Sequence, residues 1–133
     1  MRLLALLAML ALASVARAEN WVEVGADAEA KFYVDSDSIE VDRDTIRFTK
    51  RGIYTHVLTE NFGGHKTAFK ETLGTVEIDC GRRINRVIKI EMIGENGEVV
   101  WSSGLMKQRI WEDVRQNSHA ESTLAYVCSK AGI

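Results

Sequence analysis

Proline is absent from this chain of 133 residues, and no low-complexity linker or internal repeat divides it. Glycine, Asn and Asp therefore have to mark the turns. Cysteine is scarce: Cys80 and Cys128 are the only two, and the C-x-x-C spacing of a thioredoxin-like redox site is missing. Basic residues form no stripe, because the densest runs are Lys50-Arg51 and Arg82-Arg83. This distribution argues against a nucleic-acid-binding protein.

Sequence signatures of catalysis are also missing. Ser102-Ser103-Gly104 follows a strand pattern and does not form the G-x-S-x-G nucleophile elbow. Gly63-Gly64 lacks the following Lys-Ser/Thr and the helix of a phosphate-binding loop. We therefore expect no catalytic residue and no cofactor, and we predict that the protein is not an enzyme.

The candidate metal ligands have the wrong spacing. If Asp35 opened an EF-hand loop, Glu40 and Ile46 would occupy the sixth and twelfth positions, where Gly and Glu are needed. The three histidines, His56, His65 and His119, show no paired spacing typical of zinc. We expect no metal site, and we interpret the acidic run from Asp35 to Asp44 as a solvated turn region.

A single long apolar run, Leu3–Val15, lies at the start of the chain. Arg2 precedes it and Ala16-Arg17-Ala18 follows it, which is the pattern of a secretory signal peptide over residues 1–18. Cleavage is expected between Ala18 and Glu19. Thirteen apolar residues are too few for a stable bilayer span, and no later stretch approaches membrane length. We therefore predict an exported protein, periplasmic or secreted, without a transmembrane segment after signal removal.

The remaining 115 residues, 19–133, are enough for one domain. Loss of Arg2 and Arg17 leaves 15 basic and 19 acidic side chains, so the formal net charge changes from -2 to -4. In an oxidising compartment the two cysteines most simply form one disulfide, Cys80–Cys128. Such a bond closes 48 residues and stabilises the fold by roughly 4 kcal/mol in the chain-entropy model. A reactive thiol pair is the alternative.

Period-two alternation of apolar residues dominates the sequence after the signal peptide. It predicts strands over Trp21–Val24, Lys31–Asp35, Ser38–Val41, Thr45–Thr49, Ile53–Thr59, Thr67–Cys80, Ile84–Ile93 and Val99–Trp101. Turns are expected at Asp42–Asp44, Asn61–His65 and Asn96-Gly97. Gly52 interrupts the alternation and is expected at a bulge or bend.

The end of the chain changes to helical spacing. Ser118 and Glu121 form a capping box, and Leu124, Val127 and Cys128 then share one face. The fold class predicted is therefore α+β: an antiparallel sheet of about five or six strands, packed by a C-terminal helix and tied by one disulfide. Trp101 and Trp111 flank a segment without a clear pattern. We expect both to fill the core between sheet and helix, with an aromatic ligand surface as the alternative.

The order of short motifs resembles a known family. The motifs are Trp21-Val22-Glu23-Val24, Phe32-Tyr33-Val34-Asp35, Asp79-Cys80, Trp111-Glu112-Asp113-Val114 and Val127-Cys128. Together with the signal peptide, they resemble the surface-adhesin protein E family of small exported bacterial proteins. The resemblance makes residues 19–133 a single domain of this type. It implies a role in adhesion through binding of host extracellular-matrix or serum proteins.

One feature departs from the family pattern. Family adhesins can carry a lipid on a cysteine just after the signal peptide, whereas here residue 19 is Glu and no cysteine precedes Cys80. We therefore expect no lipid anchor. The alternative function is that of a soluble periplasmic protein of envelope maintenance, which binds a small ligand or another envelope protein. A long apolar groove in the structure would favour binding of a small ligand, and a flat exposed aromatic patch would favour a protein partner. Two convergent titratable groups in a cleft would favour an enzyme. No ligand-binding residue can be named from the motifs.

Overall fold

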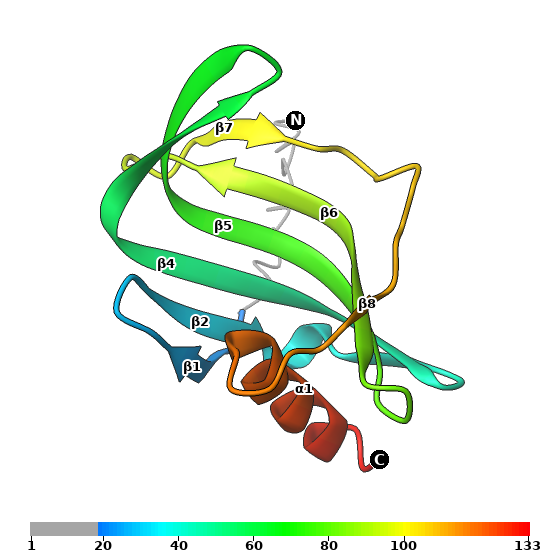
Figure 1. Cartoon of the computed structure of the whole chain (residues 1–133). Helices are drawn as coiled ribbons and strands as arrows, with labels where there is room; N and C mark the ends of the chain where they lie inside the picture. Colours follow the sequence, from blue (N-terminus) through cyan, green and yellow to red (C-terminus); the bar gives the residue numbers. More distant parts are fainter. Residues whose placement is uncertain (1–18) are drawn as a thin grey trace, which may run out of the picture.

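Antiparallel strands make up most of the computed structural model, which describes residues 19–133 (Figure 1). The expected signal peptide, residues 1–18, lies outside the described residues. The elements in chain order are β1 (Trp21–Ala26), β2 (Ala30–Asp35), the short 3-10 helix η1 (Ser36–Ser38), β3 (Glu40–Asp42), β4 (Thr45–Phe62), β5 (His65–Asp79), β6 (Ile84–Ile93), β7 (Val99–Ser102), β8 (Glu112–Asp113) and α1 (His119–Lys130).

Within residues 19–133 the strands form one sheet with the order β1-β2-β4-β5-β6-β7. Two short strands extend its edges: β3 pairs with the start of β4 at Glu40↔Arg47, and β8 pairs with the start of β6 at Asn85↔Glu112. The predicted antiparallel sheet with a C-terminal helix is confirmed. The six strands of the main order match the expected number, and β3 and β8 add to them.

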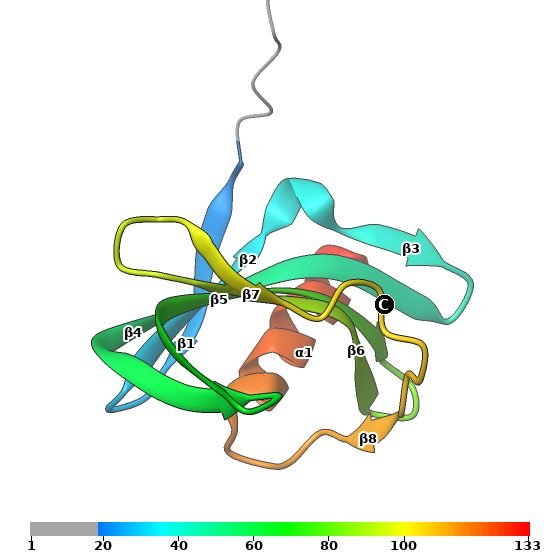
Figure 2. The ribbon, with the colours of Figure 1, turned by 90° about the horizontal axis from the view of Figure 1, so that it is seen from above.

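Glycine and Asn or Asp positions make the turns, as expected without proline. Gly63 and Gly64 join β4 to β5 with φ values of 58° and 86°, the left-handed backbone of a tight two-residue hairpin. The register of β4 against β5 shifts between Ile53 and Leu58, and the long β4–β5 hairpin bends over the sheet in this region (Figure 2). The prediction that Gly52 lies at the irregularity is wrong, because Gly52 stays in register with Thr72 and the shift follows Ile53.

The core lies between the sheet and α1. Its buried members are Val34, Ile46, Phe48, Ile78, Val114, Leu124, Val127 and Cys128. The predicted capping box is present: the Ser118 hydroxyl accepts a hydrogen bond from the Glu121 amide at 3.2 Å, and the Glu121 carboxylate accepts one from the Asn117 amide at 3.3 Å. The predicted Cys80–Cys128 disulfide joins the turn after β5 to α1 across 48 residues.

Candidate ligand-binding site

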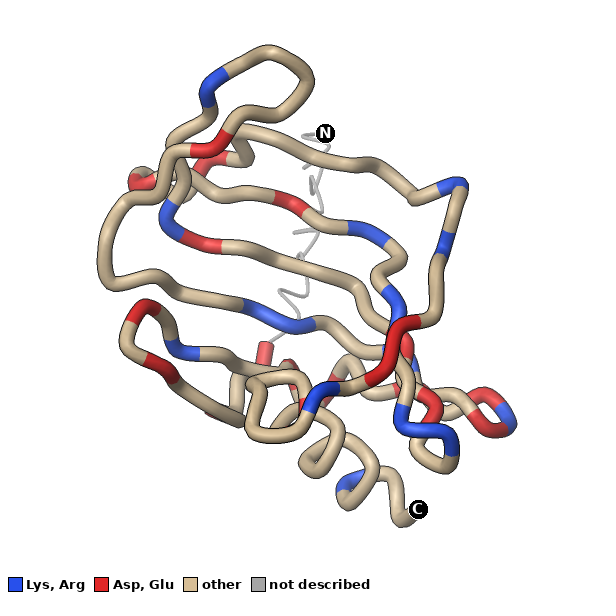
Figure 3. The backbone as a smooth tube through the Cα atoms, viewed as in Figure 1, with Lys and Arg blue, Asp and Glu red and all other residues tan. Residues whose placement is uncertain are grey.

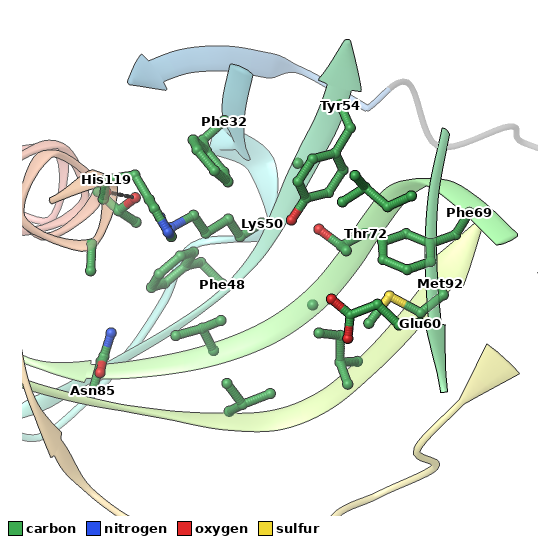
Figure 4. A pocket seen from close by; sticks show the side chains of 18 of the residues that line it. Phe32, Phe48, Lys50, Tyr54, Glu60, Phe69, Thr72, Asn85, Met92 and His119 are labelled. Carbon is green, nitrogen blue, oxygen red and sulfur yellow. Dashed lines mark hydrogen bonds between the residues drawn. The ribbon is translucent and has the colours of Figure 1, made fainter. Parts of the chain in front are cut away.

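A cavity of about 340 Å³ opens on the side of the sheet that α1 covers (Figure 4). Its walls come from β2, β4, β5, β6 and the first turns of α1. The apolar side chains that line it include Phe32, Phe48, Leu58, Phe62, Phe69 and Met92. This volume is at the lower end of the roughly 300–1,000 Å³ found for small-molecule sites, which are also mostly apolar.

Two glycines shape the wall of the cavity, and only one of them leaves open space. Gly74 is the register partner of Lys50 on β4 and of Ile90 on β6, so no side chain separates these two neighbours. A Cβ atom at Gly74 would meet no atom closer than the Lys89 carbonyl at 3.6 Å. At Gly52 a Cβ atom would lie 2.8 Å from Thr72 Oγ1 and 3.3 Å from the Phe32 ring. Gly52 therefore allows close packing of two strands, which is why glycine interrupts the alternation there.

Lys50 is the cation of the cavity. It follows Ile46 and Phe48 in the inward phase of β4, and both of those side chains are buried in the core. The Lys50 Nζ atom lies 2.8 Å from His119 Nδ1 and 5.2 Å from the centroid of the Phe32 ring. The His119 ring, at the first residue of α1, stacks on Phe32 with centroids 3.9 Å apart. Figure 4 shows these three side chains together at the helix end of the cavity.

The Lys50 ammonium has no acidic partner in the described part of the chain, since no Asp or Glu oxygen there lies within 4.0 Å of it. Burial lowers the pKa of Lys50 to about 8. Burial, and then the charge of Lys50, lower the pKa of His119. An ammonium group can only donate hydrogen bonds, so His119 Nδ1 accepts and the ring proton lies on Nε2. At pH 7 the site therefore holds one cation beside a neutral imidazole.

Further polar groups lie toward the other end of the cavity. Figure 4 places the Tyr54 hydroxyl near Thr72, and Glu60 beside Phe69 and Met92. Burial, followed by the charges of Asp27, Glu60 and Glu29, raises the pKa of Tyr54. The Glu60 carboxylate is exposed. The cavity thus has a cation at its helix end, and hydroxyl groups and an exposed carboxylate farther from the helix.

The opposite side of the sheet carries ion pairs between neighbouring strands. Arg51 holds Glu71 with contacts of 2.8 and 3.0 Å. Glu77, which is only 6% exposed, accepts from Arg47 at 3.4 Å and from Arg86 at 3.3 Å. Basic and acidic residues are interspersed along the strands, without a long run of one sign (Figure 3). Among residues 19–133, each of these arginines has an acidic partner within 3.4 Å, unlike Lys50 in the cavity.

Exposed apolar side chains gather along one edge of the sheet. After β7 the chain continues beside β6, with the Ser103 amide donating to the Ile90 carbonyl at 2.9 Å and the Met106 amide to the Ile88 carbonyl at 2.8 Å. We call residues 99–110 the edge segment. Its exposed members include Val99 (54%), Val100 (37%), Leu105 (71%) and Ile110 (68%). This edge is a candidate surface for a protein partner.

The structure bears on several of the residues that the sequence analysis singled out. Cleavage between Ala18 and Glu19 involves residues outside the described part and stays a prediction. The acidic run has a local role, because the Asp35 carboxylate accepts from the amides of Asp37 and Asn20. Among residues 19–133, no three His, Cys, Asp or Glu side chains are grouped as a metal would require. In the same residues, no helix has the length and apolar character to cross a membrane.

The expectation that both tryptophans fill the core between sheet and helix is wrong. Trp101 stacks on Phe62 at 4.6 Å, away from α1, because β7 pairs with the far end of β6. Trp111 is covered by the guanidinium of Arg86, 4.3 Å from its ring. The sequence analysis also missed the cavity. Its available signal was Lys50, which directly follows the predicted strand Thr45–Thr49 at the position that continues the inward phase of Ile46 and Phe48.

The fold and the site define a class: a disulfide-bonded α+β domain in which a curved antiparallel sheet and one helix enclose a small apolar cavity. The chain belongs to the surface-adhesin protein E family, whose model matches residues 21–129. The family resemblance seen in the sequence is thus confirmed.

Solved structures show the same fold at low sequence identity. Crystal form II of Haemophilus influenzae protein E matches with a TM-score of 0.60 and 12% identity, over 84% of this chain and 99% of that one. Protein E from non-typeable Haemophilus influenzae matches with a TM-score of 0.56 and 13% identity, over 86% of this chain and 87% of that one. A comparison with functionally curated protein sequences finds no match.

Proposed function

We propose that this chain is an exported, non-enzymatic adhesin, which attaches to host extracellular-matrix or serum proteins. Membership of the surface-adhesin protein E family over residues 21–129 is the observation that carries the proposal. Residues 1–18 direct export, and the mature chain starts at Glu19 without a lipid. To reach host proteins, the protein acts as a secreted protein or from the cell surface.

The edge segment is the surface that we assign to the protein partner. Leu105 and Ile110 are large apolar side chains that are mostly exposed, and such side chains supply binding energy when a partner buries them. Val99 and Val100 extend the same edge on β7, the last strand of the main sheet order. An edge strand also offers backbone groups to a further strand.

Surface plasmon resonance of residues 19–133 on immobilised matrix and serum proteins tests this proposal. The double variant Leu105→Glu, Ile110→Glu places charge on the edge segment. Val41→Glu is the matched control, because Val41 is similarly exposed (53%) but lies on β3. We expect at least tenfold weaker binding for the double variant and no change for the control. Absence of binding to any matrix or serum protein by the wild type would contradict the adhesin function.

The cavity favours a second candidate function, binding of a small ligand by a protein of the cell envelope. A preformed, mostly apolar hollow with a few polar groups is what small-molecule sites have in common. Lys50 and His119 also converge there, as two groups of an enzyme would. We assign the pair to binding, because a lysine with a pKa of about 8 keeps its proton at pH 7 and is then no nucleophile.

A further inference from the structure

Building on the small-ligand function, we infer that the cavity binds an amphipathic monocarboxylate, whose carboxylate pairs with Lys50 and whose apolar body lies along the aromatic wall. Charge complementarity identifies this occupant. Lys50 brings a positive charge into an apolar hollow, and the residues described supply no acidic partner for it within 4.0 Å. A bound carboxylate would provide the missing partner.

The hydrogen-bonding capacity of Lys50 supports this assignment. An ammonium group has three donors and no acceptor. His119 Nδ1 accepts one hydrogen bond at 2.8 Å, and the Phe32 ring contributes a cation–π contact without taking a proton. Two donors therefore remain for a ligand. A hydrogen bond between an ammonium and a carboxylate is shorter and stronger than one between neutral groups, so a carboxylate is favoured over an alcohol or amide.

The rest of the cavity specifies the other end of the ligand. Gly74 leaves room beside Lys50, and Phe48, Leu58 and Phe69 provide apolar walls for an alkyl or aryl body. Glu60 lies toward the opposite end and places a carboxylate there (Figure 4). A second acidic group on the ligand would be repelled there. The site thus selects a molecule with one anionic end and one apolar end.

Isothermal titration calorimetry with three ten-carbon probes tests the inference on residues 19–133. Decanoate carries the carboxylate, 1-decanol replaces it with a neutral hydroxyl, and decyl phosphate carries a different anion. The variants are Lys50→Met, which keeps an apolar stem without charge, and Lys107→Met as control, since Lys107 is exposed and outside the cavity. Gly74→Leu and the smaller Gly74→Val fill the space beside Lys50. Thermal melts first confirm that each variant is folded.

We expect decanoate to bind the wild type and Lys107→Met equally, and to bind Lys50→Met at least tenfold more weakly. 1-Decanol should bind the wild type more weakly than decanoate and should not distinguish wild type from Lys50→Met. Any Gly74 variant that folds should bind decanoate and 1-decanol more weakly than the wild type does.

Three results would overturn the inference, and they are distinguishable. If decanoate binds Lys50→Met as tightly as wild type, the lysine does not hold the carboxylate, although the small-ligand function stands. If decyl phosphate binds at least tenfold more tightly than decanoate, the ligand is a phosphate amphiphile. If no probe binds the wild type, the small-ligand function itself fails, and the carboxylate assignment fails with it.

Discussion

Replacing Lys50 with Met should make the protein more stable at pH 7. The wild type buries a cation in an apolar cavity beside an uncharged histidine and an aromatic ring. Removal of the charge relieves its desolvation, while the Met side chain keeps the packing against Phe32 and Phe48. If deleting a charge raises the free energy of unfolding, the charge destabilises the wild type. Destabilising groups of this kind are typical of functional sites.

The pKa shift sets the size and the pH range of this effect. Lysine titrates at 10.5 in the unfolded chain and at about 8 in the folded one. Below about pH 8 Lys50 is protonated in both the folded and the unfolded chain, so the destabilisation by its buried charge is fully present. Between about 8 and 10.5 the unfolded chain binds more protons, so stability rises with pH and the cost disappears. At about 1.4 kcal/mol per pKa unit the limit is about 3.5 kcal/mol, and partial solvent access of Lys50 reduces the expected gain to roughly 1–2 kcal/mol.

Urea unfolding of wild type, Lys50→Met and Lys107→Met at several pH values between 7 and 10.5 measures the effect. Taking the difference between variants cancels the titration of groups that both proteins share near the cavity, of which Tyr54 is the one with a pKa closest to this range. The advantage of Lys50→Met should shrink as the pH rises, and NMR should show the pKa of His119 rising in this variant, because the neighbouring charge is gone. A Lys50→Met protein that is less stable than wild type at pH 7, or an advantage that is independent of pH, would refute the reasoning.

Four further predictions concern the scaffold. Replacing Cys80 and Cys128 with Ala should lower the free energy of unfolding by at most about 4 kcal/mol relative to the oxidised wild type, measured by urea unfolding of the oxidised wild type, the reduced wild type and the double variant; identical midpoints for all three forms would contradict it. Gly52→Ala should cost about 1–3 kcal/mol, because its Cβ meets Thr72 and Phe32, whereas Gly74→Ala should cost under 1 kcal/mol; equal losses would show that strand contact does not explain Gly52. Glu77→Gln should cost about 2 kcal/mol by weakening its two arginine contacts, and an unchanged unfolding midpoint would count against this. A chelator should leave the melting temperature unchanged, and a drop of several degrees would reveal a metal site.

Local signals in the sequence were sufficient for much of the fold. Alternation predicted the long strands, Gly63-Gly64 and Asn96-Gly97 marked their hairpins, and the Ser118 capping box marked the start of α1. Two cysteines in a chain predicted to be exported left one simple pairing. Strand β8 was missed because two residues, Glu112–Asp113, are too short to show a period. Trp101 was misplaced because the position of β7 along β6 depends on a register that alternation does not encode.

The cavity could not be predicted for a related reason. The cavity depends on the bend of the β4–β5 hairpin after Ile53 and on the position of the first turns of α1 against the sheet. Both are set only when the whole sheet is assembled. Lys50 lies one residue beyond the predicted strand Thr45–Thr49, at the position that continues the inward phase of Ile46 and Phe48, but His119 lies 69 residues later and meets it only in the folded chain. A charge at an inward position is therefore a useful sequence signal for a site, even when its partners are distant.

Both candidate functions require an exported, oxidised protein, and cell fractionation combined with intact-mass measurement tests this requirement most directly. Cells that produce the full chain are separated into cytoplasm, periplasm, outer membrane and medium, and the protein is weighed in each fraction. The account predicts a chain that starts at Glu19, without an acyl group and with Cys80 and Cys128 joined, outside the cytoplasm. A protein found in the cytoplasm with residues 1–18 attached and two free thiols would contradict it.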